Sequence, residues 1–128
     1  MKIILVDAWN TLITENGIYM EMYNMLEKFD EKKIILSNAN KNEQLEFGMV
    51  NLPYDFFSLE HQPNKSNPKY FKLLIKKFDY NPNSLIYFDH DIAAIDSARS
   101  IGITSCYYNS KEKNVFEIQE FIQLNINK

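Results

Sequence analysis

The sequence predicts an α/β fold, a three-layer α/β/α sandwich around a mostly parallel, Rossmann-like sheet of five strands. Short apolar runs rich in β-branched residues are typical of strands buried on both faces of a parallel sheet. In this chain such runs alternate with segments whose apolar residues recur at helical spacing. Repeated strand-helix-strand units of this kind pack their helices on both faces of one sheet.

The expected strands are short apolar runs bounded by polar residues. Three are clear, over 2–6, 33–36 and 84–88. A fourth, weak and short, lies near 56–59, and a fifth lies near 104–108. None approaches the roughly 20 apolar residues that a membrane-spanning helix needs. The sequence therefore predicts no membrane segment.

Helices are expected between these strands. The first begins just after Gly17, where apolar residues at helical spacing are Ile18, Met22, Met25, Leu26 and Phe29. The other helices are expected near 41–48, 67–78, 92–101 and 114–124.

Residues at the helix ends support these boundaries. Asn67 and Pro68 suit an N-cap and a first helical position. Gly102 suits a left-handed residue at a helix C-terminus, and Asn114 with Glu117 three residues later is typical of a helix start.

Composition limits the classes of protein to consider. With 128 residues the chain can form one hydrophobic core, so residues 1–128 are expected to be a single domain. A hydrophobic fraction of 45% with only 3 Gly and 4 Pro excludes disordered and fibrous classes. The net charge is -3 and Arg99 is the only arginine, which argues against sequence-specific nucleic-acid binding.

Two features favour a cytoplasmic protein. Cys106 is the only cysteine, so no intramolecular disulfide can form, and we expect it to be a small buried hydrophobe. Asp7 interrupts the first apolar run too early for a signal peptide. Nothing in the sequence fixes the oligomeric state.

Polar residues follow several of the expected strands, at the edge where parallel α/β sheets bind ligands. Asp7 ends the first strand, Ser37 and Asn38 follow the second, and the segment 89–91 (Asp-His-Asp) follows the fourth. Lys65 lies in the loop before the helix that Asn67 opens. Together they could supply a nucleophile, a hydroxyl donor, an ammonium and a site for a hard cation.

The order of these residues resembles the haloacid dehalogenase (HAD) superfamily of phosphatases and related hydrolases. In that family an apolar strand ends in an Asp nucleophile, with a Thr four residues later and then a Leu, which is similar to residues 6–12 (VDAWNTL). A second strand ending in Ser or Thr, often followed by Asn, is similar to residues 34–38 (IILSN).

Two later motifs extend the resemblance over nearly the whole chain. A Lys shortly before a Pro-initiated helix is similar to residues 65–68 (KSNP). A strand ending in an acidic pair, followed by a helix of the type xxAARxxGI, is similar to residues 85–90 (LIYFDH) and 97–103 (SARSIGI). Lys69 is a competing candidate for the motif lysine.

The resemblance implies a phosphatase-type hydrolase that forms an aspartyl-phosphate at Asp7. Thr11 or Ser37 would donate to a phosphoryl oxygen, and Lys65 would neutralise charge. The substrate would be a phosphorylated small molecule or macromolecule. The residues expected to bind substrate are Trp9 and Asn38. The residues expected to bind a divalent metal are Asp7, Asp89 and His90. The Trp9 backbone carbonyl and Asp91 are expected beside that metal.

Two positions depart from the family pattern. Family phosphatases usually have a second Asp two residues after the nucleophile as general acid and base, but here the residue is Trp9, whose indole has no transferable proton. A typical carboxylate ligand is replaced by His90. The resemblance implies magnesium, whereas a mixed imidazole and carboxylate set favours manganese or zinc.

The spacing of the motifs leaves no room for a cap domain. The intervals between Asp7, Ser37 and Lys65 are too short to hold the helical cap of the dehalogenase branch, and Arg99 lies away from any such cap. Dehalogenation is therefore disfavoured, and the sequence predicts a capless HAD-like core.

Several alternatives stay open at this point. The changed positions also fit a catalytically degenerate protein kept as a binding or regulatory module. Ser37 and Asn38 could instead cap the helix near 41–48. Trp9 could fill the crevice where substrate would bind, and no role is assigned to His61.

Overall fold

The structure is a computed structural model that describes residues 1–128. Its helices and strands, in chain order, are β1 (Ile3–Asp7), β2 (Ile13–Thr14), β3 (Gly17–Ile18), α1 (Met20–Leu26), β4 (Lys32–Ser37), α2 (Lys41–Glu46), β5 (Asp55–Ser58), α3 (Pro68–Phe78), the 3-10 helix η1 (Pro82–Ser84), β6 (Leu85–Asp89), α4 (Ile92–Arg99), β7 (Thr104–Tyr107) and α5 (Val115–Asn125).

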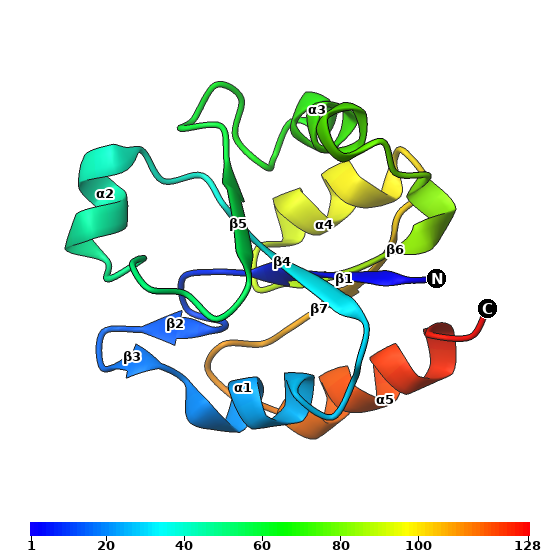
Figure 1. Cartoon of the computed structure of the whole chain (residues 1–128), viewed down its shortest axis with the longest axis horizontal. Helices are drawn as coiled ribbons and strands as arrows, with labels where there is room; N and C mark the ends of the chain where they lie inside the picture. The colour runs from blue at the N-terminus through cyan, green and yellow to red at the C-terminus, as the bar shows by residue number, and fades with distance from the viewer.

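Five strands form one parallel sheet in the order β5-β4-β1-β6-β7. Helices α1 and α5 cover one face and α3 and α4 cover the other (Figure 1). This is the predicted three-layer sandwich. None of the helices combines the length and apolar character that a membrane crossing needs.

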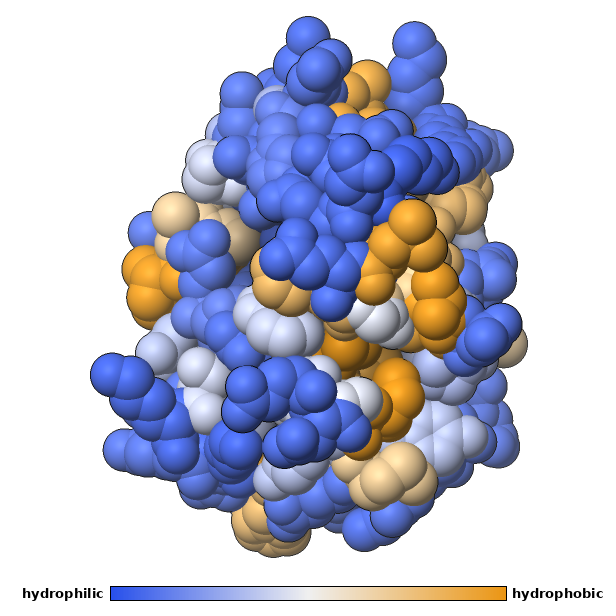
Figure 2. Space-filling model, turned by 90° about the vertical axis from the view of Figure 1, so that its left-hand side faces the viewer, coloured by the Kyte–Doolittle hydropathy of each residue, from blue (hydrophilic) through white to orange (hydrophobic).

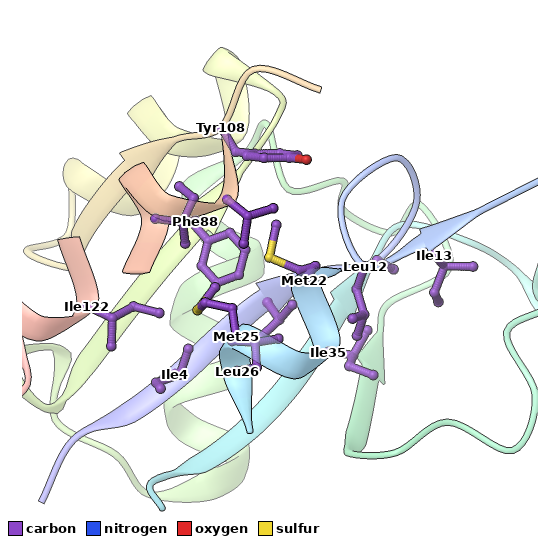
Figure 3. Close-up of a cluster of buried hydrophobic side chains, with 14 of the residues drawn as sticks. Ile4, Leu12, Ile13, Met22, Met25, Leu26, Ile35, Phe88, Tyr108 and Ile122 are labelled. Carbon is purple, nitrogen blue, oxygen red and sulfur yellow. The ribbon is translucent and has the colours of Figure 1, made fainter. Parts of the chain in front are cut away.

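The central strands are buried on both faces, as their continuous apolar sequences predict. Along β1, Ile4 and Val6 pack on the side of α1 and α5, whereas Ile3 and Leu5 pack on the side of α3 and α4. Figure 3 shows the first of these two clusters, in which Ile4 and its neighbours contact side chains of α1 and α5. Each fully buried aliphatic side chain stabilises the fold by about 1.5–3 kcal/mol.

The first helix begins later than the apolar pattern predicts. Ile18 belongs to a short antiparallel hairpin, in which Ile13 pairs with Ile18 and Thr14 pairs with Gly17. Gly17 has a φ of +97°, a conformation that glycine adopts without a steric cost. The turn therefore delays the helix to Met20, so the prediction that α1 starts just after Gly17 is wrong.

The caps follow the sequence signals closely. Asn67 accepts a hydrogen bond from the Lys69 amide, and Asn114 accepts one from the Glu117 amide. Helix α4 ends at Arg99, and Gly102 beyond it has the expected positive φ of +89°.

Between the first strand and Lys65 the chain forms only the β2–β3 hairpin, α1, β4, α2 and β5. No separate cap domain is inserted there. Helix α2 lies beyond the carboxyl end of the sheet, on the same side of the molecule as the hairpin (Figure 1).

Candidate active site

Three neighbouring strands end in polar residues at the same edge of the sheet. Asp7 is the last residue of β1, Ser37 of β4 and Asp89 of β6, and β1 lies between the other two strands. All three residues are buried. The topology thus brings polar groups from distant parts of the sequence to one place.

Lys65 joins two of these strand ends. Its Nζ lies 2.6 Å from Asp7 Oδ1 and 2.7 Å from Asp89 Oδ2, and only 6% of its side chain is exposed. The Lys65 amide donates to Asn38 Oδ1 at 2.7 Å. Lys69 is exposed and lies in the first turn of α3, so Lys65 is the lysine of this cluster.

The second oxygen of Asp7 has two further partners. Thr11 Oγ1 donates to Asp7 Oδ2 at 2.7 Å, and His90 Nδ1 lies 2.5 Å from the same oxygen. The segment after β1 turns back on itself, because the amides of Leu12 and Ile13 both donate to the Ala8 carbonyl. This turn places the Thr11 hydroxyl beside the carboxylate.

Helix α2 is capped by Asn40, which accepts from the Glu43 amide at 2.9 Å. The alternative in which Ser37 and Asn38 cap this helix is therefore wrong. Ser37 Oγ accepts from the Ala39 amide and contacts Met49 Sδ. Ser37 and Asn38 are left facing the cavity at the sheet edge.

Two buried tyrosines support the cluster, and the sequence analysis missed both. Tyr87 donates its hydroxyl to Asp89 Oδ2, and Tyr70 donates to the carbonyls of Ser37 and Phe57. A buried phenol needs an acceptor, so Tyr87 two residues before Asp89 on one strand was an available signal.

The charges of the cluster balance one another. Burial by itself raises the pKa of Asp7, but the Lys65 ammonium and the His90 ring outweigh it and hold that pKa well below its usual range. Burial and the neighbouring Asp7 charge raise the pKa of Asp89. Burial alone lowers the pKa of Lys65, but the charges of Asp7 and Asp89 raise it above its usual range. Asp7 is therefore ionised at neutral pH.

Asp7, Asp89 and His90 could hold a metal ion. Each offers one ligand atom, and these atoms all lie within 4.8 Å of one another. The donor set is two carboxylate oxygens and one imidazole nitrogen, which fits a divalent first-row ion.

A cavity of about 480 Å³ opens above these residues at the sheet edge. Figure 2 views the molecule from this side and shows hydrophobic residues in and beside a hollow on a mostly hydrophilic face. The apolar part of the wall is formed by Trp9, Ala39, Phe47 and Met49, and the Trp9 and Phe47 ring centroids are 4.6 Å apart. Trp9 lines the cavity and leaves it open, so the alternative in which it fills the crevice is wrong.

His61, which received no role from the sequence, also lines this cavity. Its Nε2 lies 2.6 Å from Glu43 Oε1, and its Nδ1 lies 2.7 Å from Asn64 Oδ1. No local sequence signal marks this contact, because Glu43 lies in α2 and His61 in the loop after β5. Cys106 is half-buried in β7 and outside the cavity.

Solved structures share the fold over most of the chain. An uncharacterized protein from Corynebacterium glutamicum is 17% identical with a TM-score of 0.62, and the match covers 96% of each chain. A HAD-superfamily hydrolase from Ehrlichia chaffeensis is 22% identical with a TM-score of 0.61, over 84% of this chain and 57% of that one. A β-phosphoglucomutase from Clostridium difficile is 20% identical with a TM-score of 0.57, over 91% and 61% of the two chains.

No protein-family model matches the chain, and no curated protein matches it. The structural matches and the strand order show that this chain shares the α/β fold of the HAD-superfamily hydrolase from Ehrlichia chaffeensis, with no separate cap domain between its elements. This fold carries the buried group of Asp7, Asp89 and His90 at the carboxyl edge of its sheet.

Proposed function

We propose that the protein is a capless phosphohydrolase that hydrolyses phosphomonoesters through an aspartyl-phosphate at Asp7. The observation that carries the proposal is the Lys65 ammonium bridging Asp7 and Asp89 below an open cavity. A buried ammonium beside an ionised carboxylate can offset the charge of an incoming phosphoryl group. A phosphorylated substrate is also what one of the structural neighbours, the β-phosphoglucomutase, is named for.

In the proposed first step an oxygen of Asp7 attacks phosphorus and the bond from phosphorus to the leaving oxygen breaks. Thr11 and Lys65 hold the Asp7 carboxylate in place through hydrogen bonds of 2.7 and 2.6 Å. Ser37 and Asn38 line the cavity and would donate to phosphoryl oxygens. Water then attacks phosphorus and releases Asp7, so the nucleophile is regenerated.

Asp7, Asp89 and His90 would hold a divalent ion, with the Trp9 carbonyl as a further ligand. When bound, the ion would polarise the phosphoryl oxygens and neutralise charge. Because His90 contributes nitrogen, we propose manganese or zinc ahead of magnesium.

The substrate would bring its organic group against the apolar wall of Trp9 and Phe47. No cap covers this wall, so both small phosphoesters and phosphorylated macromolecules can reach it. A missing general acid costs typically 10²–10⁴-fold in rate, which predicts slow turnover of esters with poor leaving groups.

A second candidate is a degenerate binding module, which one observation favours. Both oxygens of Asp7 already accept hydrogen bonds, from Lys65 on one side and from Thr11 and His90 on the other. A carboxylate so fully engaged is a poorer nucleophile until one of these bonds is released.

Hydrolysis of 4-nitrophenyl phosphate with manganese, zinc or magnesium separates the two candidates. The phosphohydrolase predicts turnover that Asp7→Asn abolishes, whereas exposed Lys69→Gln leaves it unchanged. Turnover that persists in Asp7→Asn, or none in the wild type with any of the ions, contradicts the proposed function.

A further inference from the structure

The titratable groups around the nucleophile have no proton to give to a leaving group. Lys65 holds its ammonium between the carboxylates of Asp7 and Asp89. His90 turns its Nδ1 to Asp7, and a metal bound there would displace that proton. These groups are therefore committed to the nucleophile and to charge balance.

The other titratable groups on the cavity wall are occupied as well. His61 contacts Glu43 through Nε2 and Asn64 through Nδ1, so neither ring N–H is directed into the cavity. The Asn40 amide and His61 lower the pKa of Glu43, although burial opposes the shift, so Glu43 is ionised. Asp91 is the N-cap of α4 and accepts from a backbone amide.

Trp9, which also lines the cavity, adds no acid, because an indole N–H does not ionise near neutral pH. The leaving oxygen must then depart as an anion. A phenol ionises at a pH of about 10, whereas an aliphatic alcohol resembles water, at about 16. The site therefore favours esters whose leaving group is a phenolate.

The apolar wall suits the ring of such a leaving group. Trp9 and Phe47 are half-buried, with ring centroids 4.6 Å apart and planes tilted by 49°. Trp9 is two residues after Asp7, so their Cα atoms are at most about 7.6 Å apart. The wall thus begins beside the nucleophile, and aromatic contacts there add to the gain from burial alone.

The charges around the cavity disfavour substrates with a second anionic group. Lys65 is the only lysine or arginine on the wall, and it is already paired with two carboxylates. Four carboxylates line the same cavity, those of Asp7, Glu43, Asp89 and Asp91. A bisphosphate or a nucleotide would bring its further phosphates against these like charges without a free ammonium or guanidinium to receive them.

We propose that the site selects phosphate monoesters of phenols, with the ring of the phenol against Trp9 and Phe47; this inference rests on the proposed phosphohydrolase function. An oxygen of Asp7 forms the new bond to phosphorus, and the electron pair of the broken bond stays on the phenolate oxygen. The phenolate leaves the open cavity and takes a proton from solvent. A tyrosine side chain and a small free phenol share this chemistry.

Phenyl phosphate and cyclohexyl phosphate test the leaving-group requirement, because their rings are similar in size and their leaving oxygens differ in basicity. With no proton donor in the site, kcat/KM should be about 10²–10⁴-fold higher for phenyl phosphate. A ratio below about tenfold, in a protein that hydrolyses 4-nitrophenyl phosphate, would show that the site supplies a proton. That result would overturn the inference and leave the proposed function standing.

Variants of the wall test the aromatic contact. Trp9→Leu and Phe47→Leu should each raise the KM for phenyl phosphate by about 3- to 10-fold relative to that for acetyl phosphate, which has no ring. Phe116→Leu, which changes an exposed ring on α5 outside the cavity, is the control and should not alter this ratio. If both wall variants fold and neither alters it, the wall does not bind the ring and the inference is wrong.

A peptide with one phosphotyrosine, compared with the same peptide carrying phosphoserine, distinguishes the two sources of the phenol. The phosphotyrosine peptide should be hydrolysed about 10²–10⁴-fold faster than the phosphoserine peptide. A kcat/KM above that of phenyl phosphate would identify polypeptides as the source, and a lower one would identify small phenols. Equal rates for the two peptides would overturn the inference, whereas no turnover of 4-nitrophenyl phosphate would contradict the proposed function as well.

Discussion

Lys65 is the residue on which the electrostatics of the site depend. Its ammonium lies between two buried carboxylates that the sheet brings together, and each carboxylate also accepts a hydrogen bond from a neutral hydroxyl. A neutral hydroxyl can donate a hydrogen bond to a carboxylate, but it cannot replace the positive charge of Lys65. Without Lys65, Asp7 and Asp89 would lie buried side by side with only the partly exposed His90 ring to offset their charge, which is costly.

We therefore predict that Lys65→Met destabilises the protein by about 3–5 kcal/mol at neutral pH, the usual cost of breaking a buried ion pair. The cost should shrink as pH falls, because protonation of the carboxylates removes the unpaired charge. Urea denaturation at several pH values measures both effects, with exposed Lys69→Met as control. A cost below about 1 kcal/mol, as for exposed pairs, would show that the bridge does not hold the site together.

His90 makes metal binding depend on pH. Its hydrogen bond with Asp7 raises the pKa of His90, although burial opposes the shift. In the metal-free protein this pair contributes stability that is fully present below the unfolded pKa of histidine, about 6.5. That stability is lost as pH rises through the higher folded pKa. A metal must displace this proton, so metal affinity should increase over the same range.

Melting curves with manganese, zinc and magnesium at equal concentration test this prediction. Bound ions stabilise the fold by RT ln(1 + [L]/Kd), and the gain in Tm should grow with pH and be larger for manganese or zinc than for magnesium. The difference should diminish in His90→Ala. Identical melting curves with every ion and with a chelator would show that Asp7, Asp89 and His90 do not bind a metal ion.

Among the helices, α2 depends most on its cap. It spans 6 residues, buries none of them and carries Glu43 near its start, with Phe47 directly after its end. Short helices are marginal without packing, so the capping box of Asn40 and Glu43 fixes this part of the cavity wall.

We predict that Asn40→Ala lowers the free energy of unfolding by about 1 kcal/mol, within the usual range for an N-cap. Lys41→Ala, at the first position of the same helix, is the control and should alter stability by less than about 0.5 kcal/mol. If urea denaturation gave the same free energy of unfolding for Asn40→Ala as for the wild type, the Asn40 cap would not stabilise α2.

The elements differ in how far the sequence determines them. The strands β1, β4 and β6 are continuous apolar runs, and burial on both faces of a parallel sheet requires that pattern, so their positions could be predicted. The hairpin before α1 could not, because Ile18 fits the helical spacing equally well and only the turn at Gly17 excludes it. His61 could not be found either, since its partner Glu43 is brought to it by the packing of α2 against a distant loop.

At the scale of the whole molecule, the carboxyl edge of the sheet is an open face with one tryptophan on its cavity wall. Trp9 is the only tryptophan in the chain, so fluorescence excited at wavelengths that the 8 tyrosines do not absorb reports on this wall alone. The assignment of residues 1–128 to a single domain stays a prediction. Association of several copies of the chain also stays a prediction.

Binding in the cavity should therefore change Trp9 emission. In the Asp7→Asn variant, which cannot turn over the ester, 4-nitrophenyl phosphate should quench the emission saturably, and Lys65→Met should weaken that binding. N-acetyltryptophanamide titrated with the same ester serves as the control for absorption of light by the ester and for non-specific quenching. Quenching that does not saturate, or that is the same for N-acetyltryptophanamide, would mean that the cavity does not bind the ester.

The proposed reaction requires that Asp7 becomes phosphorylated during turnover. Rapid acid quenching of the wild type during turnover of 4-nitrophenyl phosphate should trap this state, because Trp9 supplies no general base to speed the attack by water. Mass spectrometry of the peptide containing Asp7 is the most direct measurement. We expect a phosphoryl group on Asp7 that is absent from an otherwise identical Asp7→Asn sample. Steady turnover with no phosphoryl group on that peptide, or with the group on another residue, would rule out an aspartyl-phosphate at Asp7.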